Sequence, residues 1–157
     1  MEDIAGARTI CEFLGDIVLI EKAILNKEAS DFGIRLHQGF KDNRRDYLSK
    51  GLANGYRSLH LILGITIATL SGSTQEIPCE LQLRTVFQDG WARKYHLTLY
   101  GKSRKLRRRF GDKLAKMSQL LHECDMLADE VATEVMQTKE EKEDRKGNTE
   151  TLPIFLK

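Results

Sequence analysis

Polar and apolar side chains alternate along residues 80–85, which read ELQLRT. Side chains on a strand point to opposite faces in turn, so Glu80, Gln82 and Arg84 would share one face and the leucines between them the other. A carboxylate, an amide and a guanidinium on one face are costly to bury without partners. The pattern therefore predicts a surface that binds a charged ligand, with the solvated face of an antiparallel hairpin as the alternative.

A second polar stretch, residues 46–60, reads DYLSKGLANGYRSLH and combines a glycine-bearing loop with Tyr56. The alternation that follows predicts a strand over residues 57–67, which we expect to pair with residues 77–84 as a hairpin. Tyr56 also fits an ordinary loop anchor, and His60 also fits a structural histidine. Position alone does not separate these readings.

The elements that precede this loop are read from residue type and spacing. Residues 7–14 mix β-branched and aromatic residues and predict a strand. Asp16 is expected to cap a helix over residues 17–27, whose isoleucines fall on one stripe. Residues 34–39 predict a short strand, and residues 41–45 a polar, basic turn.

Two helices are expected after the hairpin. The first begins at Thr85 or Asp89, runs through Tyr100 and ends at Gly101. The second is long and carries an apolar seam at steps of four and three, which predicts packing on another helix of the same chain or of a partner subunit. The seam comprises Phe110, Leu114, Met117, Leu121, Cys124, Ala128, Val131 and Val135.

Composition limits the class of protein. A chain of 157 residues with a net charge of +2 forms one domain and is not a strongly basic nucleic-acid binder. Three scattered cysteines favour reduced thiols in the cytoplasm over a structural metal site. No apolar run approaches the ~20 residues that span a membrane. Residues 102–109 (KSRKLRRR) fit a solvated helix face, with RNA contact as the less favoured reading.

Four segments in order resemble the synthetase domain of the RelA/SpoT family, in particular the small alarmone synthetases: DIAGAR at 3–8, the loop at 46–60, ELQLRT at 80–85 and WARKYHLTLY at 91–100. The resemblance extends over residues 2–135. It implies an α+β fold, a nucleotidyltransferase-like mixed sheet flanked by helices, with a long C-terminal helix.

The resemblance also implies a division of the chain and an activity. Residues 1–101 would be the catalytic core, residues 102–146 a helical extension and residues 147–157 a tail. The family transfers pyrophosphate from ATP to the 3′-hydroxyl of GTP or GDP with Mg²⁺, producing the alarmone (p)ppGpp of the stringent response. The relatives are cytoplasmic homo-oligomers, often tetramers.

The site residues follow from the same resemblance. Asp3 and Glu80 match the two acidic residues that hold metal, and Glu80 also matches a group that assists deprotonation of the 3′-hydroxyl. Tyr56 matches the aromatic residue that stacks on guanine. The other substrate-binding positions are Asn54, His60, Gln82, Arg84, Arg8, Lys50 and His96.

The sequence departs from the family pattern in three places. Gly51 and Leu52 replace a Pro-Lys pair, so Lys50 is expected to take the place of the lysine. Tyr95 replaces a glutamate. The family's basic ATP-binding segment lies upstream of the motif at 3–8, so the core is expected to be shortened at its N-terminus.

Two alternatives stay open. A toxin-type relative would pyrophosphorylate tRNA 3′ ends and use residues 102–109 to contact the RNA backbone. A non-catalytic module would bind guanine nucleotides or would assemble through the apolar seam.

Overall fold

The computed structural model describes residues 5–26 and 30–147. Asp3, one of the two predicted acidic metal ligands, lies outside the described residues, as does the predicted tail from residue 148 onward.

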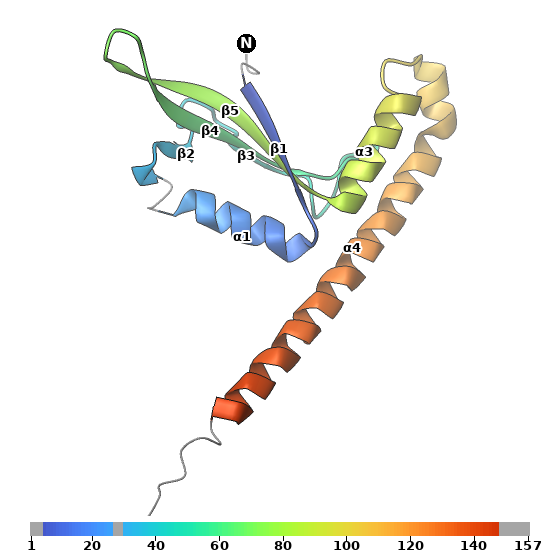
Figure 1. Ribbon diagram of the computed structural model, residues 1–157. Helices are drawn as coiled ribbons and strands as arrows, with labels where there is room; N and C mark the ends of the chain where they lie inside the picture. The colour runs from blue at the N-terminus through green and yellow to red at the C-terminus, as the bar shows by residue number, and fades with distance from the viewer. Residues whose placement is uncertain (1–4, 27–29, 148–157) are drawn as a thin grey trace, which may run out of the picture.

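Five strands form one mixed sheet with the order β1-β5-β4-β2, and β3 also pairs with β4 (Figure 1). β1 runs parallel to β5, while every other pairing is antiparallel. The strands are β1 (Ala5–Cys11), β2 (Ile34–Leu36), β3 (Arg44–Asp46), β4 (Leu59–Ala68) and β5 (Thr74–Thr85). The expected α+β class with a mixed sheet and a long C-terminal helix is confirmed.

The helices whose bounds lie in the described residues are α1 (Leu14–Leu25), α3 (Val86–Thr98) and α4 (Arg104–Gly147). α1 lies against one face of the sheet, and α3 follows directly from the end of β5 (Figure 1). α4 packs on α3 and then passes the N-terminal end of α1. No helix in the described part of the chain is both long and apolar enough to cross a membrane.

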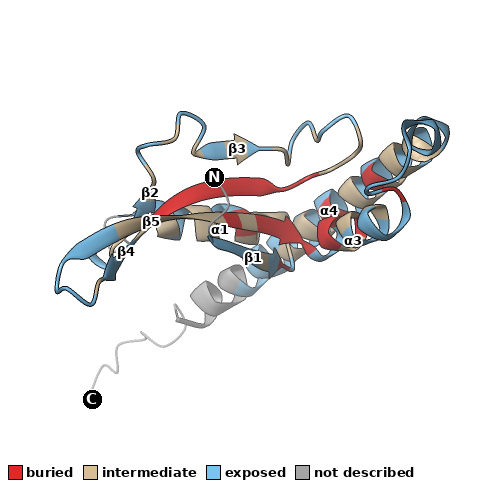
Figure 2. Cartoon of the chain, turned by 90° about the horizontal axis from the view of Figure 1, so that it is seen from above, coloured by how far each residue is buried: buried red, intermediate tan, exposed pale blue. Residues whose placement is uncertain are grey.

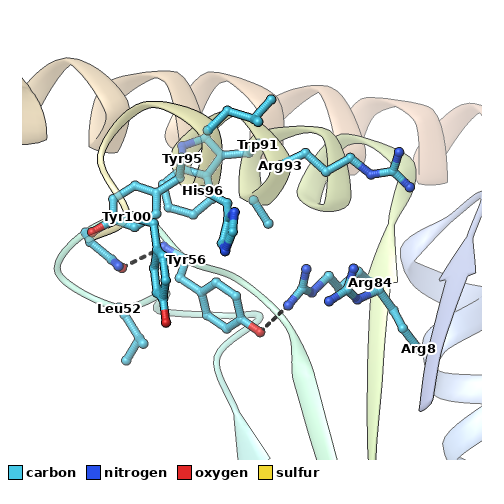
Figure 3. A pocket seen from close by; sticks show the side chains of 12 residues that line it. Arg8, Leu52, Tyr56, Arg84, Trp91, Arg93, Tyr95, His96 and Tyr100 are labelled. Atoms are coloured by element: carbon cyan, nitrogen blue, oxygen red, sulfur yellow. Dashed lines mark hydrogen bonds between the residues drawn. The ribbon is translucent and has the colours of Figure 1, made fainter. Parts of the chain in front are cut away.

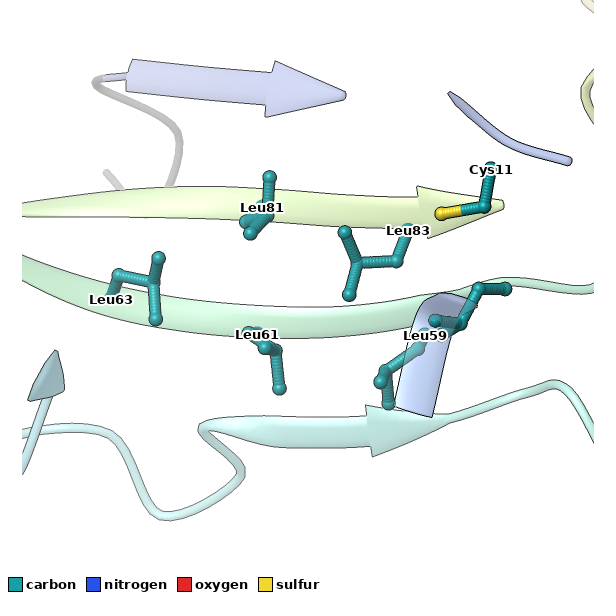
Figure 4. Packing of buried hydrophobic residues seen from close by; sticks show 7 residues of the cluster. Cys11, Leu59, Leu61, Leu63, Leu81 and Leu83 are labelled. Atoms are coloured by element: carbon teal, nitrogen blue, oxygen red, sulfur yellow. The ribbon is translucent and has the colours of Figure 1, made fainter. Parts of the chain in front are cut away.

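The predicted hairpin of β4 and β5 is confirmed, and its two faces differ in character. Alternate leucines of both strands point toward α1 and form the core with a cysteine of β1 and an isoleucine of α1 (Figure 4). These core residues are Cys11, Ile17, Leu59, Leu61, Leu63, Leu81 and Leu83. Burial is concentrated along β4 and the end of β5 (Figure 2). The opposite face carries Glu80, Gln82 and Arg84, as strand alternation predicts.

Two local predictions on the N-terminal half are wrong. Asp16 is not the N-cap: Phe13 holds that position, and the Asp16 carboxylate, in the first turn, accepts a hydrogen bond from the Phe13 backbone N–H at 2.9 Å. Residues 41–45 are not all turn, because Arg44–Asp46 form β3. This three-residue strand is supported by its pairing with β4, which a local pattern does not reveal.

α4 packs on α3 through only part of its predicted apolar seam. Five seam residues are half-buried: Phe110, Leu114, Met117, Leu121 and Ala128. Cys124, Val131 and Val135 are exposed, and the buried residues among them, Ser118 and Asp125, are polar.

Two carboxylates of α4 make specific contacts with neighbouring helices. Asp125 Oδ2 accepts a hydrogen bond at 2.8 Å from Thr85 Oγ1, the N-cap of α3. Asp129 Oδ1 accepts one at 2.7 Å from the Gly15 N–H in the first turn of α1. A carboxylate near a helix N-terminus is favoured by the helix dipole and satisfies free N–H groups. α4 therefore holds the N-terminal ends of α1 and α3 through polar contacts.

Candidate active site

The helix-free face of the sheet brings four polar side chains into one row. Cross-strand partners on neighbouring strands share a face, and the register pairs Arg45 of β3 with His60 of β4. His60 in turn pairs with Gln82 of β5, and Gln82 with Arg8 of β1. Residues from four strands, far apart in sequence, are thus aligned across the sheet beside Glu80.

Two chains of hydrogen bonds run from Arg84 to Glu80. In the first, Arg84 Nη2 donates to the Tyr56 hydroxyl at 2.6 Å, that hydroxyl lies 2.7 Å from His60 Nε2, and His60 Nδ1 lies 2.9 Å from Glu80 Oε1. In the second, Arg84 Nη2 donates to Gln82 Oε1 at 2.8 Å, and Gln82 Nε2 donates to Glu80 Oε2 at 2.7 Å. The carboxylate and the tyrosine are therefore held in a fixed relation.

The direction of these bonds assigns the state of His60. A carboxylate only accepts, so the proton of the ring lies on Nδ1, and in a neutral ring Nε2 then accepts the Tyr56 hydroxyl proton. Burial lowers the pKa of His60 below its ordinary 6.5 against the opposing attraction of Glu80, and nearby Arg84 and Arg45 lower it further. His60 is therefore neutral at pH 7 and every donor in the first chain has an acceptor.

The same contacts keep Glu80 ionised. Burial acts to raise the pKa of the Glu80 carboxyl, but the hydrogen bonds from Gln82 and His60 and the charge of Arg45 outweigh it, and the pKa falls below its ordinary value. Each carboxylate oxygen keeps a second lone pair for a further donor. Glu80 thus offers a negative, partly exposed acceptor next to the tyrosine.

A cavity of about 760 Å³ lies between the Tyr56 loop and α3 (Figure 3). The guanidinium of Arg84 covers one side of the Tyr56 ring, 4.9 Å from its centroid, and Tyr100 lies on the other side. Tyr100 itself is stacked on His96 with ring centroids 4.4 Å apart. Aromatic rings on both sides of an open space suit a flat heteroaromatic ligand. The cavity is lined by Arg8, Leu52, Asn54, Tyr56, Arg84, Trp91, Ala92, Arg93, Tyr95, His96, Leu97 and Tyr100.

Cations gather at one end of this cavity around a single buried carboxylate. Asp89 lies 2.6 Å from Arg93, 3.4 Å from Arg8 and 3.5 Å from Arg84. Three guanidinium groups beside one carboxylate leave a net positive charge. A guanidinium group can also donate two parallel hydrogen bonds to a phosphate. The cavity therefore combines a site for a ring with a site for phosphates.

Comparison with known proteins agrees with this geometry. The family model described as "Region found in RelA / SpoT proteins" matches residues 1–105. The chain belongs to the RelA/SpoT family.

Individual RelA/SpoT relatives extend the match. The GTP pyrophosphokinase YwaC of Bacillus subtilis is 30% identical over 125 residues, which are 80% of this chain and 55% of YwaC. The chain thus spans little more than half the length of this relative. The small alarmone synthetase 1 of B. subtilis bound to its product pppGpp matches 87% of this chain and 64% of that one, with 28% identity and a TM-score of 0.69. The same synthetase bound to AMPCPP matches with 26% identity, over 87% of this chain and 63% of that one, with a TM-score of 0.59.

Most RelA/SpoT-like positions predicted from the sequence meet in one place. Arg8, Asn54, Tyr56, Arg84 and His96 line the cavity. Glu80, His60 and Gln82 connect to it through the two hydrogen-bond chains. The Asn54 side chain also supports the loop, since its Oδ1 accepts the Tyr56 N–H at 3.0 Å.

Other predicted positions lie apart from the cavity. Lys50 is exposed and does not line it. The basic run at 102–109 is also exposed and outside the lining. Neither position contributes to the cavity in this structure.

Several residues at or beside the site were not predicted, among them the cavity-lining Arg93 and Tyr100. Arg45 acts electrostatically on His60 and Glu80, Tyr47 packs edge-on to His60 at 5.4 Å, and Asp89 holds the arginines. Strand parity would have identified Arg45 if residues 44–46 had been read as a strand. The spacing of Asp89 and Arg93, four apart on a helix, was the available signal for that pair.

The acidic groups of the described residues do not form a metal site by themselves. No group of three or more histidine, cysteine, aspartate or glutamate side chains in this part of the chain could hold an ion. Mg²⁺ in nucleotide enzymes is usually held by one or two carboxylates together with substrate phosphates. Glu80, ionised and partly exposed, suits one such ligand.

Proposed function

We propose that this chain transfers pyrophosphate from ATP to the 3′-hydroxyl of GTP or GDP, producing (p)ppGpp and AMP. The observation that supports this most is the fixed link between the ring-binding tyrosine and an ionised carboxylate. A guanine ring stacked on Tyr56 would have its ribose carried toward Glu80, while Arg8, Arg84 and Arg93 meet the phosphates. The relatives named as a GTP pyrophosphokinase and as a synthetase bound to pppGpp or AMPCPP support the same reaction.

In this reaction the 3′-oxygen of the acceptor forms a bond to the β-phosphorus of ATP. The bond from that phosphorus to the oxygen bridging to the α-phosphate breaks, and AMP leaves with that oxygen. Glu80 accepts a hydrogen bond from the 3′-hydroxyl and receives its proton as the bond forms. Positioning and neutralisation of phosphate charge supply most of the rate in phosphoryl transfer.

Mg²⁺ held by Glu80, Asp3 and the substrate phosphates would neutralise phosphate charge. Around it, the residues of this chain act by position. Gln82 and His60 fix the Glu80 carboxylate, and Asp89 fixes the arginines, so that little reorganisation is needed on binding.

A turnover assay tests the proposal. The protein is incubated with ATP, Mg²⁺ and GTP, and AMP and pppGpp are followed, with deacylated tRNA as a second acceptor. Glu80→Gln should lower the rate by about 10²–10⁴-fold, because an amide cannot take the proton. Tyr56→Ala should mainly raise the KM for GTP.

Glu76→Gln is the matched control, since Glu76 lies four residues earlier on β5 and pairs with exposed Arg35. The control should keep the wild-type rate. The proposal fails if Glu80→Gln matches wild type, or if wild type neither binds GTP nor releases AMP.

We also propose that the protein works in the cytoplasm as a homo-oligomer. An exposed apolar stripe on α4 supports the assembly into a homo-oligomer. Its residues, each at least 48% exposed, are Leu127, Val131, Val135 and Met136. The stripe lines a groove that Phe13 borders from the start of α1.

A further inference from the structure

The loop that carries Tyr56 is held by α4, which begins at Arg104 and lies almost wholly beyond the residues 1–105 that the RelA/SpoT family model matches. Within the loop, Gly55 N donates to Leu52 O at 2.7 Å and Leu52 N to Tyr56 O at 2.9 Å. These bonds close a tight turn but do not attach it to the sheet or to α3. Contacts on either side of Tyr56 do so.

Gly55, immediately before Tyr56, is pressed against α4. Ser118 Oγ of α4 donates a hydrogen bond to the Gly55 carbonyl. A Cβ atom on Gly55 would lie 2.8 Å from Ser118 Cβ, 3.1 Å from Ala115 Cα and 3.1 Å from Trp91 Cζ2, too close for any side chain. Gly55 also has φ of +92°, which favours glycine. The backbone therefore fits α4 and α3 at this point without free space.

Arg57, immediately after Tyr56, is also attached to α4. Its Nη2 donates to Gln119 Oε1 at 3.2 Å, while its Nη1 donates to the carbonyls of Leu48 and Ser49, to the latter at 3.0 Å. Arg57 is only 8% exposed, whereas its partner Gln119 lies on the exposed side of α4. The guanidinium ties the two ends of the loop to one helix.

α4 is also hydrogen-bonded to α3 close to Gly55. Trp91 Nε1 of α3 donates to the Leu114 carbonyl of α4 at 2.8 Å. Trp91 also lines the cavity and is 2% exposed. The loop, α3 and α4 therefore meet at one junction behind Tyr56.

We infer that Ser118 and Gln119 are positioning residues for Tyr56, and that α4 thereby sets the affinity of the site for its ring-bearing substrate. They act through the residues on either side of Tyr56 and line no part of the cavity. The inference rests on the proposed function, because it takes a guanine nucleotide as the ligand. It assigns the helical extension a part in substrate binding as well as in assembly.

Binding of GDP tests the inference without requiring turnover. Trp91 is the only tryptophan of the chain and borders the cavity, so its fluorescence reports binding directly. The double variant Ser118→Ala with Gln119→Ala should bind GDP about tenfold more weakly than wild type. Gln137→Ala, an exposed position on the same helix, is the matched control and should leave the affinity unchanged.

A double-mutant cycle separates positioning from general stability. In a Tyr56→Ala background the Ser118 and Gln119 substitutions should have no further effect on GDP affinity, because the group they position is gone. Equal loss in both backgrounds would overturn the inference, as would an unchanged affinity in the double variant. Thermal melting, measured for every variant, identifies the temperature at which all are folded.

Amide hydrogen exchange gives a readout that needs no nucleotide. Residues 51–57 should exchange at least tenfold faster in the double variant, while β4 and β5 keep the wild-type rate. Unchanged exchange in the loop would overturn the inference. If wild type does not bind GDP, the proposed function fails separately, and the exchange result decides whether α4 holds the loop.

Discussion

α1 and α4 are attached to the rest of the fold by different kinds of contact. α1 inserts Ile17, fully buried, into a cluster of leucines from β4 and β5. α4 is joined to the Tyr56 loop, the end of β5 and α1 through Ser118, Asp125 and Asp129, each with a hydrogen-bond partner there. Apolar contact supplies free energy without direction, whereas hydrogen bonds to specific atoms fix position at a modest net gain. The helix that supports the substrate loop is the one attached by directional contacts.

The largest effect on stability should come from the α1 side. Ile17→Ala removes buried methyl groups from the leucine cluster and should lower the free energy of unfolding by about 2–5 kcal/mol. Val18→Ala, at a position 47% exposed, is the control and should change it little. Urea unfolding measures both, and equal effects would contradict the assignment of the core.

On the α4 side the effect should be smaller and should depend on pH. Burial raises the pKa of Asp125 above its ordinary 3.8, although the hydrogen bond from Thr85 and the charge of Arg57 oppose this. With the folded-state pKa raised, the stability associated with protonated Asp125 is fully present below pH 3.8 and is lost as the pH rises through the folded-state pKa. Asp125→Asn carries no such charge.

The free energy of unfolding of Asp125→Asn relative to wild type should therefore increase as the pH rises from about 3 to 7, by on the order of 1 kcal/mol. The Tm of the variant should rise relative to that of wild type in the same direction. Asp112→Asn, exposed on the same helix, serves as the control. Thermal melts across this range measure the difference. A difference that does not change with pH would mean that folding does not raise the pKa of Asp125.

The smallest effect on folding should come from the outer stripe of α4. Val131→Glu places a charge at a position 61% exposed and should leave the melting temperature of the isolated chain nearly unchanged. The sedimentation coefficient should nevertheless fall, because the stripe is proposed to pack on a second copy. Glu130→Gln, on the neighbouring exposed position, should leave the assembly intact. An unaltered sedimentation coefficient for Val131→Glu would remove this stripe from the interface.

Local patterns were read correctly wherever the governing contacts are themselves local. The alternation at residues 80–85 and the hairpin with β4 are confirmed, and Thr85 caps α3 as expected because its hydroxyl accepts the Gln88 N–H three residues on. For α4 a heptad count predicted only part of the packed face. Buried Asp125 and half-buried Asp129 are held by partners on β5 and α1, and those partners cannot be seen in the sequence of the helix itself.

The site was predicted to a similar extent. Tyr56 and Arg84, singled out by motif and parity, both line the cavity, while Arg45 was missed because a three-residue strand exists only beside β4. The direct bond from His60 to Glu80 required the register of β4 against β5. That register depends on the length of the hairpin, which composition does not specify.

The parallel pairing of β1 with β5 has a consequence for the order in which the molecule folds. The β4–β5 hairpin closes through a short turn, so His60, Glu80 and Gln82 meet through contacts close in sequence. β1 can join only after a much longer segment of chain has been brought around, which costs more loop entropy and slows the step. The acidic half of the site is therefore expected to assemble in an early nucleus, and Arg8 to complete it last.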